Sequence, residues 1–292
     1  MSITVPPSSG KDDLAMSETT PKPQPLFEPE IEVQVRHALI ALRYFQIMRD
    51  QMLGQQDWNT DVFQSIHTFI LAPVFQWGGE RRTTTLLSPS GIPYADPEDD
   101  TIEQALQTAI DITATTSWKH LNHADFTARA AEVYAHIHYA QPFTLHTGQV
   151  ARIFLRKVAV LSNFNLLFAR IERETWHDAL EATLPTTPGD PVDPTPFIPV
   201  MQQIAVPVSS TNPSGYTPRK PDHYAAFDVV APWLSLYEGT SLDFKFTINE
   251  VFANNWLDGW NPNRADVANL IDHHKGRLDT RNYLEEATIK IG

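Results

Sequence analysis

The residues best suited to chemistry lie in QPFTLHTGQVAR, residues 141–152 of the chain. Apolar residues recur at helical spacing before and after this stretch, so the sequence predicts a short polar loop between two helices. A loop that leads into a helix directs free backbone N–H groups outwards, and the helix N-terminus favours a negative charge. The pattern therefore predicts an anion-binding loop, with an ordinary helix–turn–helix as the alternative. The residues of this candidate loop are Pro142, Phe143, Thr144, Leu145, His146, Thr147, Gly148, Gln149 and Arg152.

Several histidines near this loop raise the question of a metal site. They are His120, His123, His136, His138 and His146. His136 and His138 are two residues apart on a predicted helix, so their side chains point to different sides. No zinc motif with an accompanying glutamate is present. We therefore expect these histidines to hold no metal ion.

The elements around the loop are expected to be helical, which makes the predicted fold all-α. Apolar residues follow helical spacing in 31–48, 61–70, 102–110, 122–140, 154–161, 164–173, 176–184 and 197–204. Residues 83–94, TTTLLSPSGIPY, interrupt this spacing and favour a short exposed strand with a turn. Residues 1–28 have few large apolar side chains and are expected to form a disordered tail.

Composition limits the classes of function. The chain has 292 residues, 42% of them hydrophobic, which is enough for one or two domains with a real core. Its formal net charge of −13 argues against binding of bulk nucleic acid or of an anionic membrane surface. Cysteine is absent, and we find neither a membrane-spanning apolar run nor a signal peptide. The expected location is the cytoplasm.

The loop sequence resembles the HPFx(D/E)GNGRxxR signature of the Fic family, since Pro142, Phe143, Gly148 and Arg152 match in register. Upstream, residues 61–84 resemble the family stretch that ends in pWAGexR. The matching residues there are Ile66, His67, Phe75, Trp77, Gly79, Glu80 and Arg82. The resemblance covers about residues 59–205 and implies a Fic-type helical core.

Two departures from the signature concern the reaction. Fic enzymes usually transfer AMP from ATP to a protein hydroxyl, and the signature histidine removes the hydroxyl proton. Gln141 stands at that position, and an amide is no base near neutral pH. Leu145 replaces the acidic residue that holds magnesium and offers no oxygen to a hard cation. The resemblance thus implies a degenerate Fic domain.

Three further departures concern the phosphate-binding part of the loop. His146 replaces the first glycine, and its side chain is expected to resist the positive φ that such anion nests use. Thr147 replaces the asparagine, and Gln149 replaces the first arginine, so one phosphate-neutralising charge is lost. Only Arg152 is kept among the charged residues of the signature.

The resemblance also assigns a role to residues 83–94. Fic proteins carry a β-hairpin flap here, which is thought to pair its backbone with the target segment. Thr84, Thr85, Leu86 and Leu87 would form this flap, and a protein partner would bind there. An ordinary loop is the alternative.

The C-terminal residues 246–292 resemble the small antitoxin that partners some Fic toxins. In its inhibitory motif (S/T)xxxE(G/N), Asn254 stands at the Ser/Thr position and Asp258 at the Glu position, so both polar positions differ from the motif, and Gly259 matches. The resemblance implies that Asp258 pairs with Arg152, with Trp256 or Leu257 packed on the Fic core. Arg156 is expected on an outer face. A plain helical tail is the alternative.

The predicted organisation is a tail (1–28), a Fic-like domain (29–205), an ordered connector (206–245) and an antitoxin-like module (246–292). The first functional hypothesis is a pseudoenzyme that binds a protein partner or a nucleotide and contains this module as an intramolecular partner. The second is an active adenylyltransferase that uses ATP and magnesium, with His138 or His146 as replacement base. The third is a toxin relic fixed to its antitoxin. The sequence leaves the oligomeric state open.

Overall fold

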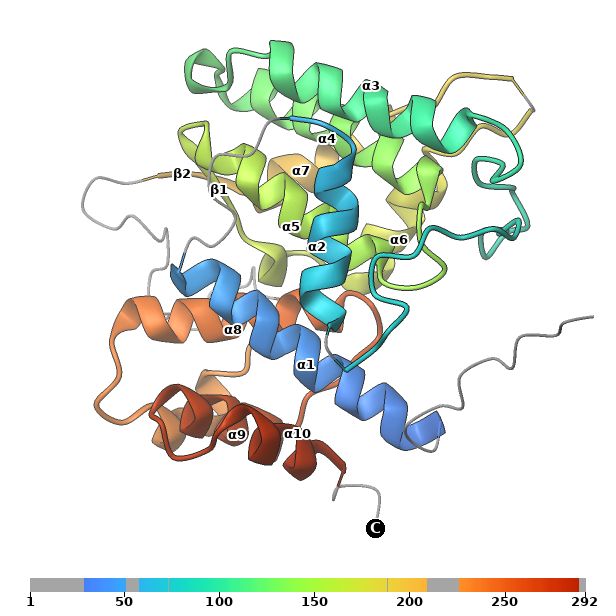
Figure 1. Cartoon of the computed structure of the whole chain (residues 1–292). Coiled ribbons are helices and arrows are strands. Elements are labelled where there is room, and N and C mark those ends of the chain that lie inside the picture. The colour runs from blue at the N-terminus through green and yellow to red at the C-terminus, as the bar shows by residue number, and fades with distance from the viewer. Residues whose placement is uncertain (1–28, 51–57, 73, 188, 209–225, 289–292) are drawn as a thin grey trace, which may run out of the picture.

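The computed structural model describes residues 29–50, 58–72, 74–187, 189–208 and 226–288. The predicted tail and the last four residues of the chain lie outside this part. The fold is helical, as predicted, and Figure 1 shows its elements. The α-helices are α1 (Pro29–Asp50), α2 (Asp61–Leu71), α3 (Thr101–Thr115), α4 (His123–Ala140), α5 (Thr147–Val160), α6 (Arg173–Glu181), α7 (Ile198–Ile204), α8 (Leu242–Trp256), α9 (Arg264–His274) and α10 (Thr280–Thr288).

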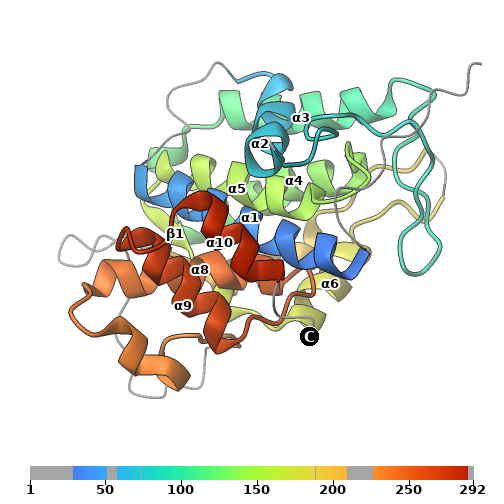
Figure 2. The same ribbon diagram turned by 60° about the horizontal axis from the view of Figure 1, so that its bottom comes forward.

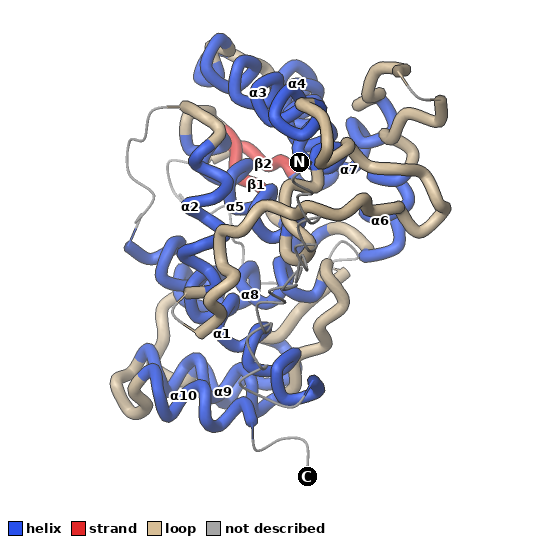
Figure 3. Tube along the Cα trace, turned by 45° about the vertical axis from the view of Figure 1, so that its right-hand side comes forward, coloured by secondary structure: helices blue, strands red, loops and turns tan. Residues whose placement is uncertain are grey.

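The 3-10 turns and strands are short. The 3-10 turns are η1 (Trp118–His120), η2 (Phe168–Arg170), η3 (Thr195–Phe197) and η4 (Ala231–Tyr237). The strands β1 (Phe164–Leu166) and β2 (Ala205–Pro207) pair antiparallel and are coloured red in Figure 3. Among the described residues, no helix is long and apolar enough to cross a membrane.

The helices α4 and α5 form the centre of the fold, with α3 packed on α4 and α2 packed on α5. The apolar stripe that predicted α4 is buried: Phe126, Ala130, Val133 and Ile137 have no exposed surface. The side chain of Asn122 caps the helix by accepting the N–H of Asp125 at 3.0 Å. This cap and stripe fix where α4 begins and which face it buries.

The predicted helix over residues 164–173 is wrong. Phe164 pairs with Pro207 and Leu166 with Ala205, so this segment begins as β1 and continues into η2. Phe164 and Leu166 are buried and Asn165 between them is not, which is the alternation of a strand. A run of apolar residues this short does not distinguish helix from strand. The predicted helix over 197–204, in contrast, is present as α7.

The interruption at residues 83–94 forms a tight hairpin-like turn with one β-bridge, between Leu87 and Pro93. The N–H of Ser88 donates to the carbonyl of Ile92 at 2.8 Å, and the N–H of Tyr94 to that of Leu86 at 3.1 Å. Gly91 adopts a φ of 84° at the turn, which a side chain would disfavour. The segment is therefore a hairpin of minimal length.

The C-terminal helices share one continuous core with the rest of the fold. Helix α8 contacts α1, α5 and η2, while α9 and α10 pack on α1, as Figure 2 shows from below. Helix α8 begins at Leu242, where Ser241 accepts the N–H of Phe244 at 3.1 Å. The predicted division between residues 245 and 246 therefore falls inside a helix.

Candidate functional site

The loop between α4 and α5 contains two non-glycine residues with positive φ. Gln141 ends α4 at φ 36°, and His146 precedes α5 at φ 67°. The expectation that the side chain of His146 resists this geometry is wrong. A left-handed conformation of a residue with a side chain costs about 1–3 kcal/mol and persists where the surroundings impose it. Trp77 supplies one such contact, since its ring is stacked on His146 with 6.2 Å between the centroids.

His67 of α2 fixes the middle of the loop. Its Nδ1 accepts the N–H of Gly79 at 2.8 Å, so the proton sits on Nε2, which donates to the carbonyl of Leu145 at 3.1 Å. The imidazole is also stacked on the ring of Phe143, with centroids 3.9 Å apart. Burial lowers the pKa of His67 to about 4. The ring is therefore neutral, and each of its two nitrogens forms a hydrogen bond with the backbone.

Arg82 joins the hairpin to the start of the loop. Its buried guanidinium donates to the carbonyls of Gln141 at 2.5 Å, of Thr84 at 2.7 Å and of Ala140 at 3.3 Å, and also to that of Ala95. A cation at the end of α4 is favourable because the last carbonyls of a helix carry partial negative charge. In the sequence, Arg82 was only a matching position of the family resemblance, and these four contacts decide its role.

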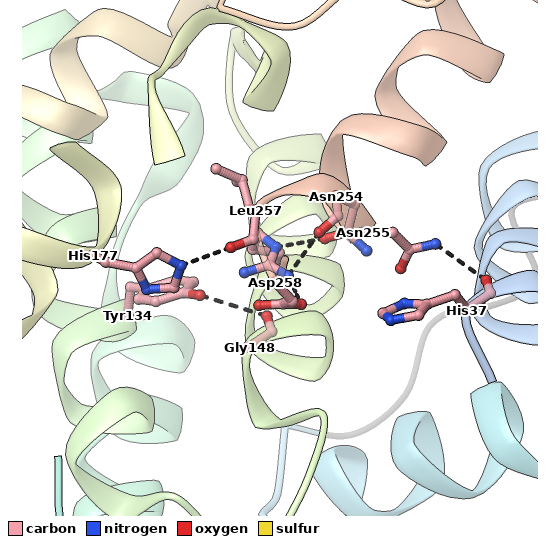
Figure 4. Close-up of polar contacts among 9 residues, drawn as sticks. His37, Tyr134, Gly148, His177, Asn254, Asn255, Leu257 and Asp258 are labelled. Atoms are coloured by element: carbon pink, nitrogen blue, oxygen red, sulfur yellow. Dashed lines mark hydrogen bonds and ion pairs between the residues drawn. The ribbon is translucent and has the colours of Figure 1, made fainter. Parts of the chain in front are cut away.

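The N-terminus of α5 has no side-chain cap, and a carboxylate lies against it. A Cβ added to Gly148 would lie 2.8 Å from Oδ1 of Asp258 and 3.1 Å from Nη1 of Arg152. Figure 4 shows Asp258 beside Gly148. A negative charge at this end of a helix is stabilised by the helix dipole. Asp258 therefore takes the place that the loop would give to an anion.

Arg152 is completely buried and holds the C-terminal segment. Its guanidinium is paired with Asp258 and donates to Asn254, from Nε to Oδ1 at 2.5 Å and from Nη2 to the backbone carbonyl at 2.9 Å. Burial is the largest single effect and lowers the pKa of Arg152, but the charge and hydrogen bond of Asp258, together with Tyr134 and Tyr44, raise the pKa above its usual value. The predicted pair of Arg152 and Asp258 is confirmed.

The residues around Asp258 also lie where the sequence suggested. Leu257 is fully buried, and Trp256 packs on the core from a partly buried position. Gly259 follows with a φ of 101° and ends the helical turn. From α6, His177 contacts the carbonyl of Leu257 at 2.7 Å (Figure 4). Asp258 is thus held in place by the packed residues that precede it.

The expectation that Arg156 lies on an outer face is wrong. Its guanidinium donates to the hydroxyl of Tyr44 at 2.8 Å, to the carbonyl of Leu166 at 2.9 Å and to Oε2 of Glu250 at 3.0 Å. The side chain of Glu250 is 3% exposed. The sequence analysis missed Glu250, although its distance of four residues from Asn254 places both on one face of α8.

The position of the signature base is occupied by an amide next to a buried histidine. Nε2 of Gln141 lies 3.4 Å from Nδ1 of His138. Burial lowers the pKa of His138 to about 4, and its Nε2 is buried without a hydrogen-bond partner. Leu145 is 42% exposed, and its side chain has no oxygen that could bind a cation. Gln141 and His138 are thus brought together, while no carboxylate stands at position 145.

The flap residues lie beside the loop and are fixed at their turn. Thr84 and Thr85 are exposed, Leu86 is partly buried and Leu87 is 63% exposed. The carboxylate of Glu181 in α6 accepts the N–H of Ser90 at 3.1 Å and the hydroxyls of Ser88 and Ser90. The hairpin is thereby held at both ends, by Glu181 at the turn and by Arg82 at its base.

The described part of the chain contains no group of three or more histidine or acidic side chains placed to hold a metal ion. His146 is stacked on Trp77, and His123 contacts the carbonyl of Ala205 at 3.1 Å, so these two serve packing. Within the loop, burial lowers the pKa of His146 to about 3, with smaller effects of neighbouring cationic groups. The loop therefore presents a neutral imidazole.

Models of known protein families give no match to the chain. The "Probable protein adenylyltransferase Fic" of Escherichia coli K12 is 25% identical over 120 residues, which cover 40% of this chain and 57% of the relative. The match thus spans little more than half of that protein.

Solved structures give a similar result. The N-terminal Fic domain of a cell filamentation protein from Bartonella quintana, a VirB-translocated Bep effector with bound ADP, matches with a TM-score of 0.50 and 19% identity, covering 61% of this chain and 86% of that one. The BepC protein of Bartonella tribocorum with bound AMPPNP gives a TM-score of 0.49 and 17% identity, covering 62% and 88%. The chain therefore has the helical fold of the solved Fic domain, and its loop residues and its similarity to the Escherichia coli protein relate it to the Fic domain family.

Proposed function

We propose that this protein is a Fic-fold pseudoenzyme that transfers no AMP and acts by binding, with its own C-terminal segment fixed on the anion loop. The exposed hairpin beside the loop would receive a protein partner, and the cytoplasm is the expected location. The observation that carries the proposal is the position of Asp258. Its carboxylate is paired with Arg152 and lies against Gly148 at the N-terminus of α5.

The charge of Asp258 opposes nucleotide binding in this place. A phosphate needs the arginine and the helix N-terminus that the carboxylate already uses. To bind there, it must displace Asp258 and leave that charge without its partner, which is costly in a partly buried position. A nucleotide is therefore expected to bind weakly to the unchanged protein.

The loss of catalytic groups supports the same proposal. Gln141 offers no base for the target hydroxyl, and Leu145 offers no ligand for magnesium. Groups that act as a unit are not replaced by the one that survives, so Arg152 alone is not expected to support transfer.

Two measurements test the proposal. Titration calorimetry with ATP, ADP and AMP, with and without magnesium, measures binding, and incubation with α-labelled ATP measures transfer to the protein itself or to lysate proteins. We expect no labelled product. The same measurements are made on a variant with the restored signature, namely Gln141→His, Leu145→Glu, His146→Gly, Thr147→Asn and Gln149→Arg. A labelled band made by the unchanged protein would contradict the proposal.

A second candidate is an active adenylyltransferase with a rearranged site. It is favoured by the position of His138, whose Nδ1 lies 3.4 Å from the amide of Gln141. This imidazole is neutral because burial lowers its pKa to about 4, so it could accept a proton, although weakly. A labelled band that disappears in the His138→Gln variant would support this candidate. ATP and magnesium would then be the cofactors.

A third candidate is a toxin relic fixed to its antitoxin. It is favoured by the pair of Arg152 and Asp258, which fits the inhibitory role that the resemblance implies. This candidate shares the absence of transfer with the first. It differs in expecting activity once the restored signature is combined with Asp258→Ala. A pseudoenzyme selected for binding alone is expected to stay inactive after these changes.

A further inference from the structure

Two helices face each other through a ladder of polar contacts. On α5, Arg152 and Arg156 lie one turn apart. On α8, Glu250 and Asn254 are four residues apart, and Asp258 follows four residues later in the turn after the helix. Arg152 contacts Asp258 and Asn254, and Arg156 contacts Glu250. Residues four apart share one helix face, so the two helices run antiparallel along this ladder.

The inner end of the ladder connects four elements. Oε2 of Glu250 accepts Arg156 at 3.0 Å and the N–H of Phe168 at 2.9 Å, and Oε1 accepts the N–H of Ala169 at 3.4 Å. Arg156 also donates to Tyr44 of α1. This single carboxylate therefore ties α8 to α5 and η2 directly, and to α1 through Arg156.

The two ends of the ladder differ in burial. The side chain of Glu250 is 3% exposed, whereas that of Asp258 is 22% exposed. The apolar residues between them are buried as well, since Val251, Phe252 and Ala253 have no exposed surface. Most of α8 thus lies in the shared core, and Asp258 lies at its edge.

We infer that Glu250 anchors α8 permanently, so that Asp258 stays on the anion loop and is not withdrawn by local opening of the C-terminal segment. The inference rests on the proposed function, because it assumes that Asp258 in this position blocks anion binding at the loop. A detachable inhibitory helix would open separately from the core. An anchored helix opens only when α5, η2 and α1 open with it.

Hydrogen exchange on the full chain distinguishes these two behaviours. In Asp258→Ala, peptides from residues 242–256 are expected to exchange as in the unchanged protein, and only residues 147–154 are expected to exchange faster. In Glu250→Gln, residues 242–256 are expected to exchange at least about tenfold faster together with residues 164–170, because one cooperative unit is loosened. If Glu250→Gln does not fold, Tyr44→Phe is measured in its place. This variant removes only the hydroxyl at Arg156, and we expect the same exchange pattern with a smaller amplitude.

Two results would overturn the anchor. One is fast exchange of residues 242–256 in Asp258→Ala while the melting temperature stays unchanged, which describes a detachable helix. The other is unchanged exchange in both Glu250→Gln and Tyr44→Phe. AMP transfer by the unchanged protein would instead refute the proposed function and leave the exchange pattern as it is, so the two failures are separable.

Discussion

Replacing Arg156 with alanine is expected to destabilise the protein about as strongly as replacing Arg152. Arg156→Ala leaves the carboxylate of Glu250 inside the fold, where its side chain is 3% exposed. Arg152→Ala removes a fully buried side chain and leaves Asn254 and Asp258 without their donor. Both substitutions leave buried or partly buried polar groups without a partner, and breaking an ion pair in this way strongly destabilises a protein.

The magnitude follows from burial. Removing one partner of a buried ion pair costs roughly 3–5 kcal/mol. Glu250 keeps two backbone N–H donors, from Phe168 and Ala169, which places Arg156→Ala towards the lower end. For a chain of this size, 1 kcal/mol corresponds to about 2–4 °C in melting temperature, so each variant should melt on the order of 10 °C lower.

The matched control is Arg281→Ala. Arg281 also pairs with a carboxylate, that of Glu285 at 2.8 Å, but its side chain is 86% exposed. Exposed pairs contribute about 0–1 kcal/mol, so this variant should unfold close to the unchanged protein. Urea unfolding at neutral pH measures all three. If Arg156→Ala unfolds like Arg281→Ala, the reasoning from burial fails.

A double substitution separates the stranded charge from the lost contact. Arg156→Met with Glu250→Gln removes both charges and keeps one oxygen acceptor, for the N–H of Phe168. This double variant should be more stable than Arg156→Ala, because no unpaired charge remains. A double variant less stable than Arg156→Ala would indicate that packing, and not charge, dominates at this position.

Three further predictions use other contacts of the site. Burial, with a smaller effect of Arg36, lowers the pKa of His37 to about 4, so the stabilising effect of its neutral ring is complete above pH 6.5 and is lost as the pH falls towards 4. His37→Phe keeps an aromatic ring on Trp260, and we expect it to remove about 1.4 kcal/mol per pH unit from the acid dependence of the unfolding free energy, measured by thermal unfolding. An unchanged pH dependence would contradict this cause. Gly148→Ala should lower the melting temperature, because its Cβ would lie 2.8 Å from Asp258; an equally stable variant would mean that Asp258 moves freely. Gln141→His alone should not restore transfer of label from ATP, and activity from this single change would show that the other losses in the loop matter less than we infer.

The sequence by itself determined the local chemistry and the main helices. An amide at position 141 and a leucine at position 145 lack a base and a metal ligand in any fold, because these are properties of the side chains. The apolar stripe and cap of α4 likewise depend only on residues one to four positions apart. The pair of Arg152 and Asp258 was predicted as well, but through the family resemblance and not through spacing.

The tertiary structure alone decided which polar faces are buried. Arg156 follows Arg152 by one turn, and nothing local distinguishes an arginine in water from one covered by another helix. The residue that pairs with Arg156 is Glu250, which lies 94 residues away along the chain. The strand at 164–166 has the same origin, since its partner at 205–207 comes from a distant segment.

The loop shows the same division. The sequence predicted that a histidine at position 146 opposes a positive φ, which is the intrinsic preference of a residue with a Cβ. The folded chain imposes φ 67° nonetheless, with Trp77 stacked on the ring and His67 holding the neighbouring carbonyl. The local preference of one residue amounts to a few kcal/mol, and the combined free energy of packing contacts with distant segments is larger. For that reason the sequence predicts which residues form the candidate site, and only the fold decided their conformation and burial.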